Sequence, residues 1–314
     1  MNDKINDILN RVLDKDIRGL SLESEGFQNI VATFNIDGNY YVARLSNKKK
    51  EWIEAEIKWL NYLQDNGIRL AAPVQFNGLD KIIEVAMNQE SYLLTFFQHT
   101  CGQPVNVLDS TEWNGEFFYR WGRTIGSLHY ISASSLDRPK GSANFHSEEN
   151  WLNECKEYLE NQLNKFPKTA NNFGLIHNDL HQGNFHITQG EIVLFDFDDC
   201  GYQFLAQDLA VSVYHSLWTG TSFHPEWEDF PNYFLTHFLE GYLSERRLTE
   251  DMYEQLLILL QMRELFLYNL FKEKWHPESM QDWQLEKLQE LERHLREKRI
   301  PYERELKKVK HYFI

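Results

Sequence analysis

Two short polar stretches carry the candidate chemistry of this chain. The first is HNDLHQGN, at residues 177–184, and the second is FDFDD, at residues 195–199. Amide and carboxylate oxygens are hard ligands that suit Mg²⁺, so Asn184 and Asp196 are candidate metal ligands. Asp179 is not needed as a ligand and could accept a proton from a hydroxyl group. A metal, its ligands and a carboxylate that orients a nucleophile are the parts that phosphoryl transfer requires.

Each stretch adjoins a short apolar run, at 175–176 and 192–195, and we expect both runs to be strands. Paired antiparallel, their ends would bring Asp179, Asn184 and Asp196 into one small volume. Carboxylates beside apolar runs are costly to hold without partners, which weakens the alternative that these are ordinary turn residues.

A zinc site is the alternative chemistry for the first stretch. His177, Asp179 and His181 alternate as HxDxH and could bind zinc if all three faced one way, with His186 or His215 completing the set. In a zinc site the spacing of Asn184 and Asp196 would be accidental, so we favour phosphoryl transfer.

The predicted secondary structure that must position these residues changes near residues 98–102, from strand-rich to mostly helical. Before this point the pattern predicts strands over 27–37 and 40–45 around a Gly38-Asn39 turn, a helix over 48–63, and strands over 81–86 and 91–97. After it the pattern is mostly helical, over 111–132, 147–163 and from 207 onward, and Pro301 ends or breaks a charged helix that starts at 281. We therefore predict an α+β chain with domains 1–98 and 99–314.

Composition and charge limit the classes of molecule that this chain is expected to bind. The chain has 314 residues and a net charge of −15, which disfavours nucleic acid and anionic membranes. Residues 101–281 hold 12 basic and 26 acidic residues, so this segment favours a cation or a metal. We find no apolar run of about 18 residues and no signal peptide, and the three cysteines are widely spaced. We predict a cytoplasmic protein.

The two polar stretches together resemble the catalytic and metal-binding loops of the aminoglycoside phosphotransferase and choline kinase family, which has the two-lobed protein-kinase-like fold. His177, Asp179 and Asn184 match its HxDxxxxN pattern, and Asp196 and Asp198 match its D-F-D element. The resemblance implies an enzyme that uses ATP or GTP with Mg²⁺. It implies Asp179 as the catalytic base, Asn184 and Asp196 as metal ligands, and Asp198 as a secondary ligand or support.

The resemblance extends into the first hundred residues. Gly26 and Asn29 resemble the turn over the nucleotide phosphates, and Arg44 stands where the family normally has a lysine that contacts phosphate. The spacing Glu56…Leu60 resembles the helix that supplies the partner of that residue, so we choose Glu56 over Glu54.

Other assignments follow from the same resemblance. Residues 93–99 resemble the strand and hinge that bind adenine through the backbone, and the hinge candidates are Phe96, Phe97, Gln98 and His99. Support of the catalytic loop is assigned to His177, His181 and Asp208, and His129 is also interpreted as structural.

In this family the C-terminal helical region builds the acceptor pocket. Aromatic side chains beside carboxylates suit an ammonium group or an amino sugar. No acceptor residue is assigned, and the candidates are Tyr214, His215, Trp218, Trp227, Glu226, Glu228, Asp229, Glu264 and Tyr268. With the acidic charge, this favours a cationic acceptor such as an aminoglycoside, an amino alcohol, homoserine or a sugar.

Two other functions stay open. One branch of the family includes bacterial stress-response protein kinases, so a protein Ser/Thr kinase is an alternative. The chain lacks an Ala-Pro-Glu element, however, and only eleven residues separate Asp196 from Asp208. The other alternative is a nucleotide-binding pseudokinase, because Arg44 replaces the usual lysine.

Overall fold

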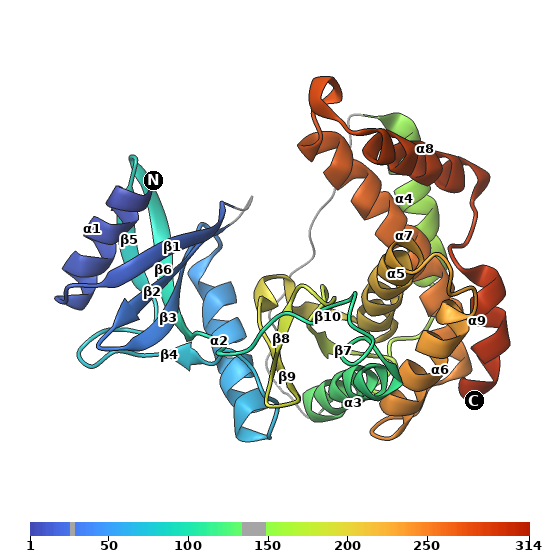
Figure 1. Cartoon of the computed structure of the whole chain (residues 1–314), viewed down its shortest axis with the longest axis horizontal. Helices are drawn as coiled ribbons and strands as arrows, with labels where there is room; N and C mark the ends of the chain where they lie inside the picture. The colour runs from blue at the N-terminus through green and yellow to red at the C-terminus, as the bar shows by residue number, and fades with distance from the viewer. Residues whose placement is uncertain (26–28, 134–148) are drawn as a thin grey trace. The chain divides into compact units, whose positions relative to one another are not determined.

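The computed structural model describes residues 1–25, 29–133 and 149–314 (Figure 1). The described chain forms two compact units. Unit 1 contains residues 1–103 and 185–198, and unit 2 contains the described parts of 104–184 together with 199–314. Residues 185–198 thus belong with unit 1, although they lie far beyond the domain boundary predicted at 98–99.

Among the described residues, unit 1 is built on a six-stranded antiparallel sheet with the order β1-β2-β3-β6-β4, in which β5 also pairs with β6. Its elements, including a separate two-stranded hairpin, are α1 (Asn2–Leu13), β1 (Arg18–Glu25), β2 (Asn29–Ile36), β3 (Asn39–Ser46), α2 (Lys50–Asp65), β4 (Pro73–Val74), β5 (Ile83–Met87), β6 (Glu90–Gln98), β8 (Phe185–Thr188) and β9 (Glu191–Leu194).

The predicted hairpin forms between β2 and β3. Its two-residue loop, Asp37 and Gly38, has φ of 53° and 86°, the left-handed conformation that matches the twist of paired strands. Burial alternates along β2, as expected for a sheet with one face on a core. The sequence patterns missed α1, β1 and β4, because β1 is mostly polar and β4 has only two residues.

The expected pairing of the two strands around the catalytic loop is wrong. β7 (Phe173–Ile176) pairs with β10 (Gly201–Phe204), and β9 pairs with β8. The β8–β9 hairpin closes through Gln189 and Gly190, both at positive φ. A two-residue loop costs less closure entropy than the longer connection between β7 and β9, so the local partner is favoured.

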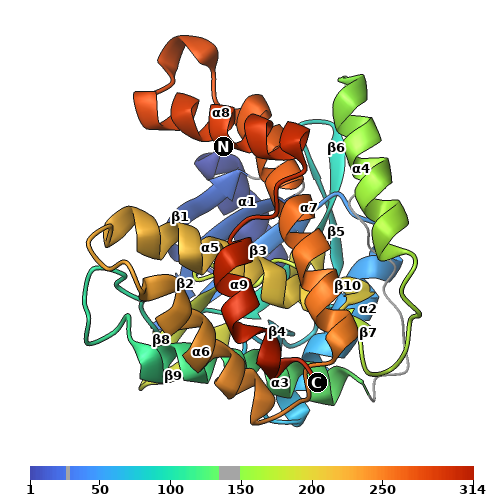
Figure 2. The same ribbon diagram turned by 90° about the vertical axis from the view of Figure 1, so that its right-hand side faces the viewer.

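Unit 2 is mainly helical (Figures 1 and 2). Besides β7 and β10, and the short η1 (Phe197–Asp199) where the units join along the chain, its elements are α3 (Gly115–Ser132), α4 (Asn150–Leu163), α5 (Ala206–Phe223), α6 (Phe230–Leu243), α7 (Glu250–Lys274), η2 (Pro277–Ser279), α8 (Asp282–Glu297), α9 (Glu303–Val309) and η3 (Lys310–Tyr312).

Helices α3 and α6 lie side by side and approach backbone to backbone (Figures 1 and 2). A Cβ added to Gly122 would lie 1.8 Å from the carbonyl oxygen of Phe238, and one added to Gly241 would lie 1.9 Å from that of Tyr119. Only glycine fits this crossing. Within the described residues, no helix is long and apolar enough to cross a membrane.

Candidate active site

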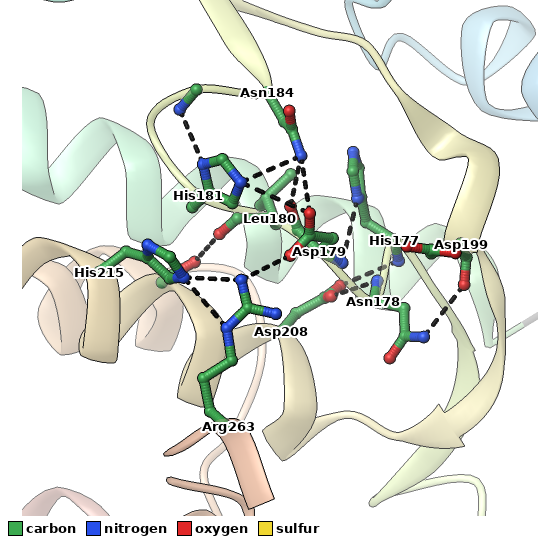
Figure 3. A network of polar contacts seen from close by, with 12 residues as sticks. His177, Asn178, Asp179, Leu180, His181, Asn184, Asp199, Asp208, His215 and Arg263 are labelled. Atoms are coloured by element: carbon green, nitrogen blue, oxygen red, sulfur yellow. Dashed lines mark hydrogen bonds and ion pairs between the residues drawn. The ribbon is translucent and has the colours of Figure 1, made fainter. Parts of the chain in front are cut away.

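The start of the loop 177–184 is held by Asp208 in the first turn of α5 (Figure 3). Its carboxylate accepts hydrogen bonds from the backbone N–H groups of His177, at 3.1 Å, and Asn178, at 2.6 Å. Asn178 has a φ of 75°, an uncommon conformation that these bonds help to hold. Asp208, a sequence-assigned support residue, is fully buried and connects the loop to α5.

A buried histidine braces Asp208 from α3. His129 Nε2 lies 3.0 Å from Asp208 Oδ2, and its Nδ1 lies 3.0 Å from the hydroxyl of Tyr242. Burial lowers the pKa of His129, although the Asp208 carboxylate works in the opposite direction. The neutral ring then donates from Nε2 and accepts at Nδ1, which satisfies both partners without a buried positive charge.

The carboxylate of Asp179 is held from three sides (Figure 3). Arg263 Nη2 lies 2.9 Å from Oδ1, as an ion pair whose N–H groups do not point along a hydrogen bond. At Oδ2, the Asn184 amide donates over 3.2 Å and His181 Nε2 lies at 3.4 Å. Two of these contacts come from the loop itself and the third comes from α7, and together they fix the carboxylate in place.

The same contacts keep Asp179 ionised. Burial alone would raise the pKa of Asp179, but Arg263 and then His181 outweigh it and hold that pKa well below its usual range. A carboxylate with so low a pKa is a weak proton acceptor. The environment therefore suits a group that orients a hydroxyl through a hydrogen bond more than one that removes its proton early.

Arg263, in α7, is itself positioned by His215, in α5. Its Nε and Nη2 lie 3.0 and 2.6 Å from His215 Nε2. Burial, and then Arg263, lower the pKa of His215 well below its usual range, so the neutral ring accepts from the guanidinium. The His215 ring also stacks on that of His181, with centroids 4.7 Å apart. No sequence signal pointed to Arg263, because it lies in the middle of a helix without a motif around it.

In unit 1, Arg44 of β3 and Glu56 of α2 form a buried ion pair, with exposures of 5% and 4%. The guanidinium makes two hydrogen bonds to the carboxylate, at 2.8 and 2.7 Å. Burial opposes the charge on Arg44, but Glu56 outweighs it and raises the pKa of Arg44 further. Glu54, by contrast, lies on the surface near Lys50.

Asp198 joins this pair to a second cation. Its Oδ1 lies 3.5 Å from Arg44 Nη1, and its Oδ2 lies 2.7 Å from Lys48 Nζ, which also donates to the Asp198 carbonyl. Lys48 was not among the candidates from the sequence, because it lies in a bend just after β3 ends at Ser46 and belongs to no motif.

The four hinge candidates lie at the end of β6 and just beyond it. Phe96 is buried in the core of unit 1, whereas the ring of Phe97 lies 4.9 Å from the Arg44 guanidinium. The backbone N–H of Gln98 donates to a carbonyl in the segment before β4. His99 follows and is partly exposed.

The predicted turn over the nucleotide phosphates is described only in part. Asn29 begins β2 and is half-buried, whereas Gly26 lies outside the described residues.

The predicted metal ligands belong to different units and are considered separately. The Asn184 amide nitrogen donates hydrogen bonds to the carbonyl and the carboxylate of Asp179. The amide oxygen of Asn184, Oδ1, is then the atom that could coordinate a hard cation. Asp196 has a φ of 61°, a conformation that non-glycine residues adopt mainly where surrounding structure enforces it. The assignment of both residues as metal ligands stays a prediction.

The zinc arrangement is not found. In the described parts of the chain, no group of three or more His, Cys, Asp or Glu side chains could hold a metal ion. Nδ1 of His177 and of His181 instead face backbone N–H groups of their own loop.

The braced loop, the paired arginine and the α+β architecture define a phosphotransferase of the protein-kinase-like class. Residues 24–248 match the model of the phosphotransferase enzyme family, and the chain belongs to this family. It is 31% identical over 261 residues to an amicoumacin kinase from Bacillus subtilis (strain 168), covering 77% of each chain.

Solved structures agree with this class. The amicoumacin kinase hAmiN, in complex with AMP-PNP, Ca²⁺ and Ami, superposes with a TM-score of 0.80 at 24% identity, over 90% of this chain and 89% of the other. A microcompartment-associated aminopropanol kinase gives 0.71 at 18% identity, over 95% and 99%. A choline/ethanolamine kinase family protein from Mesorhizobium loti gives 0.55 at 13%, over 98% and 99%. The predicted family and protein-kinase-like fold are confirmed.

Proposed function

We propose that this chain transfers the γ-phosphate of ATP to a hydroxyl group of a small molecule. The observation that carries the proposal is the Asp179 carboxylate, ionised and held by Arg263, His181 and Asn184. Such a carboxylate can align an acceptor hydroxyl for attack, and alignment accounts for much of the rate in phosphoryl transfer. Asp208 and Arg263 act through Asp179 as positioning residues.

Unit 1 would bind ATP as the phosphate donor, and GTP is the alternative phosphate donor. Arg44 and Lys48 would bring positive charge to the phosphates, while the backbone near Gln98 and His99 would receive the base. Asn184 and Asp196, supported by Asp198, would hold Mg²⁺, which when bound neutralises phosphate charge. The AMP-PNP and Ca²⁺ in the structure of the related kinase support a nucleotide with a divalent ion. A cytoplasmic location would supply the ATP.

Amicoumacin is the first acceptor to test, because the 31% identical relative is an amicoumacin kinase. Aminopropanol and spectinomycin follow from the related structures. The excess of acidic residues in 101–281 supports an acceptor with a net positive charge.

The test is ATP or GTP consumption with Mg²⁺ against amicoumacin, spectinomycin, aminopropanol, choline, homoserine and a generic protein substrate. We expect one small molecule to accept phosphate, and Asp179→Asn to abolish this while the surface variant Asp251→Asn retains it. Phosphorylation of the protein substrate alone would support the Ser/Thr kinase alternative. Nucleotide binding without transfer to any acceptor would support the pseudokinase alternative.

A further inference from the structure

One face of helix α5 contacts the loop 177–184 at four successive turns. The contacting residues are separated by four, three and four positions, the spacing that puts side chains on one side of a helix. They meet the loop in chain order, from its start to its middle. These residues are Asp208, Ser212, His215 and Thr219.

Two hydroxyl groups of this face bind the middle of the loop. Ser212 Oγ donates to the carbonyl oxygen of Leu180 over 2.6 Å, and both residues are fully buried. Thr219 Oγ1 accepts from the side-chain amide of Gln182 over 2.7 Å. A buried hydrogen bond of this kind is costly to lose, because the group left behind has no water to replace its partner.

The Ser212 contact is not the usual one for a hydroxyl group inside a helix. Ser and Thr side chains in helices commonly bond to the carbonyl four residues earlier in their own helix. Thr221, further along α5, has this ordinary contact, with the carbonyl oxygen of Leu217 at 2.7 Å. Ser212 donates its one hydroxyl proton to the loop instead.

The Ser212 bond fixes the peptide unit next to Asp179. The Leu180 carbonyl and the His181 N–H belong to this unit, and the N–H donates to the Asp179 carbonyl over 3.1 Å (Figure 3). Both polar groups of the unit therefore have a partner, which sets the orientation of its plane. The His181 ring in turn lies 3.4 Å from the Asp179 carboxylate. Rotation of this peptide unit would displace both the carboxylate and one of its partners.

We propose that Ser212 and Thr219 are positioning residues for phosphate transfer, which hold the loop so that the Asp179 carboxylate stays aligned with the acceptor hydroxyl. The proposal rests on the proposed phosphotransferase function. Alignment contributes much of the rate in phosphoryl transfer, and a displacement of about 1 Å can lower the rate about 10²-fold. Loss of either hydroxyl should therefore lower kcat without a matching change in nucleotide binding.

The first test measures transfer from MgATP to the best acceptor among amicoumacin, spectinomycin, aminopropanol, choline and homoserine. We expect Ser212→Ala and Thr219→Val to lower kcat by about tenfold, with the KM for ATP within about twofold of the wild type. Thr219→Ser keeps the hydroxyl and should restore most of the rate. A loss of global stability alone would not divide kcat from KM in this way.

Ser216→Ala is the matched control. Ser216 lies on the same helix and is fully buried, but its hydroxyl has no hydrogen-bond partner among the described residues. Its removal should leave kcat within about twofold of the wild type. Thr219 is only half-buried, so Thr219→Val keeps the test available if Ser212→Ala does not fold.

Hydrogen exchange of the loop gives a readout that needs no turnover. In the ADP-bound protein we expect the amides of 177–184 to exchange about tenfold faster in Ser212→Ala and Thr219→Val, and at the wild-type rate in Ser216→Ala. Unchanged exchange in the first two variants, unchanged kcat in both, or an equal loss in Ser216→Ala would overturn the proposal. Faster exchange in a protein whose wild type phosphorylates none of the acceptors would refute the proposed function and leave the contacts of the loop established.

Discussion

Arg263 Nη2 lies 2.9 Å from Oδ1 of Asp179, so a residue of α7, far from the catalytic loop in sequence, sets the charge state of the Asp179 carboxylate. His215 fixes the other side of the same guanidinium. The aspartate is thereby kept ionised by a cation that is too buried, at 8% exposure, to be screened well by salt.

Replacing Arg263 should shift the pH dependence of phosphate transfer. Arg263 lowers the pKa of Asp179, and transfer needs the ionised carboxylate, so loss of the cation raises that pKa. We expect Arg263→Ala to return the pKa of Asp179 toward its ordinary value, so that the kcat/KM profile gains an acidic limb at about pH 4 that the wild type lacks, and Arg263→Lys to remove most of it. An Arg263→Ala profile that overlays the wild type would contradict the coupling.

Removing the charge of Asp179 should separate catalysis from nucleotide binding. We expect Asp179→Asn to lower kcat by about 10²–10⁴-fold, as for the loss of a group that aligns the attacking hydroxyl. The affinity for AMP-PNP, measured by calorimetry, should stay within about threefold of the wild type, since this residue is assigned to the acceptor side. Full activity in this variant would remove Asp179 from the mechanism.

Breaking the pair in unit 1 should cost stability. Glu56→Gln leaves the buried Arg44 guanidinium with only the more distant Asp198, at 3.5 Å, as a counter-charge, so we expect the free energy of unfolding to fall by about 3 kcal/mol. Glu54→Gln is the matched control, because that side chain is 56% exposed and its pair is worth at most about 0.5 kcal/mol. Urea unfolding measures both, and equal midpoints would show that the buried pair does not stabilise the protein.

Replacing Lys48 should weaken nucleotide binding more than replacing its neighbour Lys49. Lys48 Nζ is placed by Asp198 beside the Arg44 pair, whereas Lys49 is exposed. We expect Lys48→Ala to weaken AMP-PNP binding with Mg²⁺ by about tenfold, the size of one charge-assisted hydrogen bond, and Lys49→Ala to change it little. The same affinity in both variants would place the phosphates elsewhere.

The crossing of α3 and α6 should not tolerate a methyl group. Gly241→Ala would put a Cβ 1.9 Å from the Tyr119 carbonyl oxygen, so the helices must separate. We expect a loss of about 2–3 kcal/mol in the free energy of unfolding, as for overpacked cores. At Gly174 the added Cβ has an ordinary 3.4 Å contact, so Gly174→Ala should cost about 1 kcal/mol or less. Thermal unfolding of both variants distinguishes these outcomes.

Local patterns predicted much of the fold and part of the site. The β2–β3 turn, the α2 helix and the choice of Glu56 depend on residues close together in sequence, where spacing determines direction. The expected β7–β9 pairing was wrong for the opposite reason. Short apolar runs have several possible partners, and the two-residue loop at Gln189 favoured another one.

The sequence by itself determined the family of this protein, because the patterns that contain Asp179, Asn184 and Asp196 are recognisable by residue type and spacing alone. Only the tertiary structure decided what surrounds them. Arg263 contacts Asp179, and the His215 ring stacks on that of His181, across helices whose packing depends on many side chains at once. Side-chain contacts between distant segments leave no periodic or spacing signal in the sequence, so the residues that tune the site became visible only in the fold.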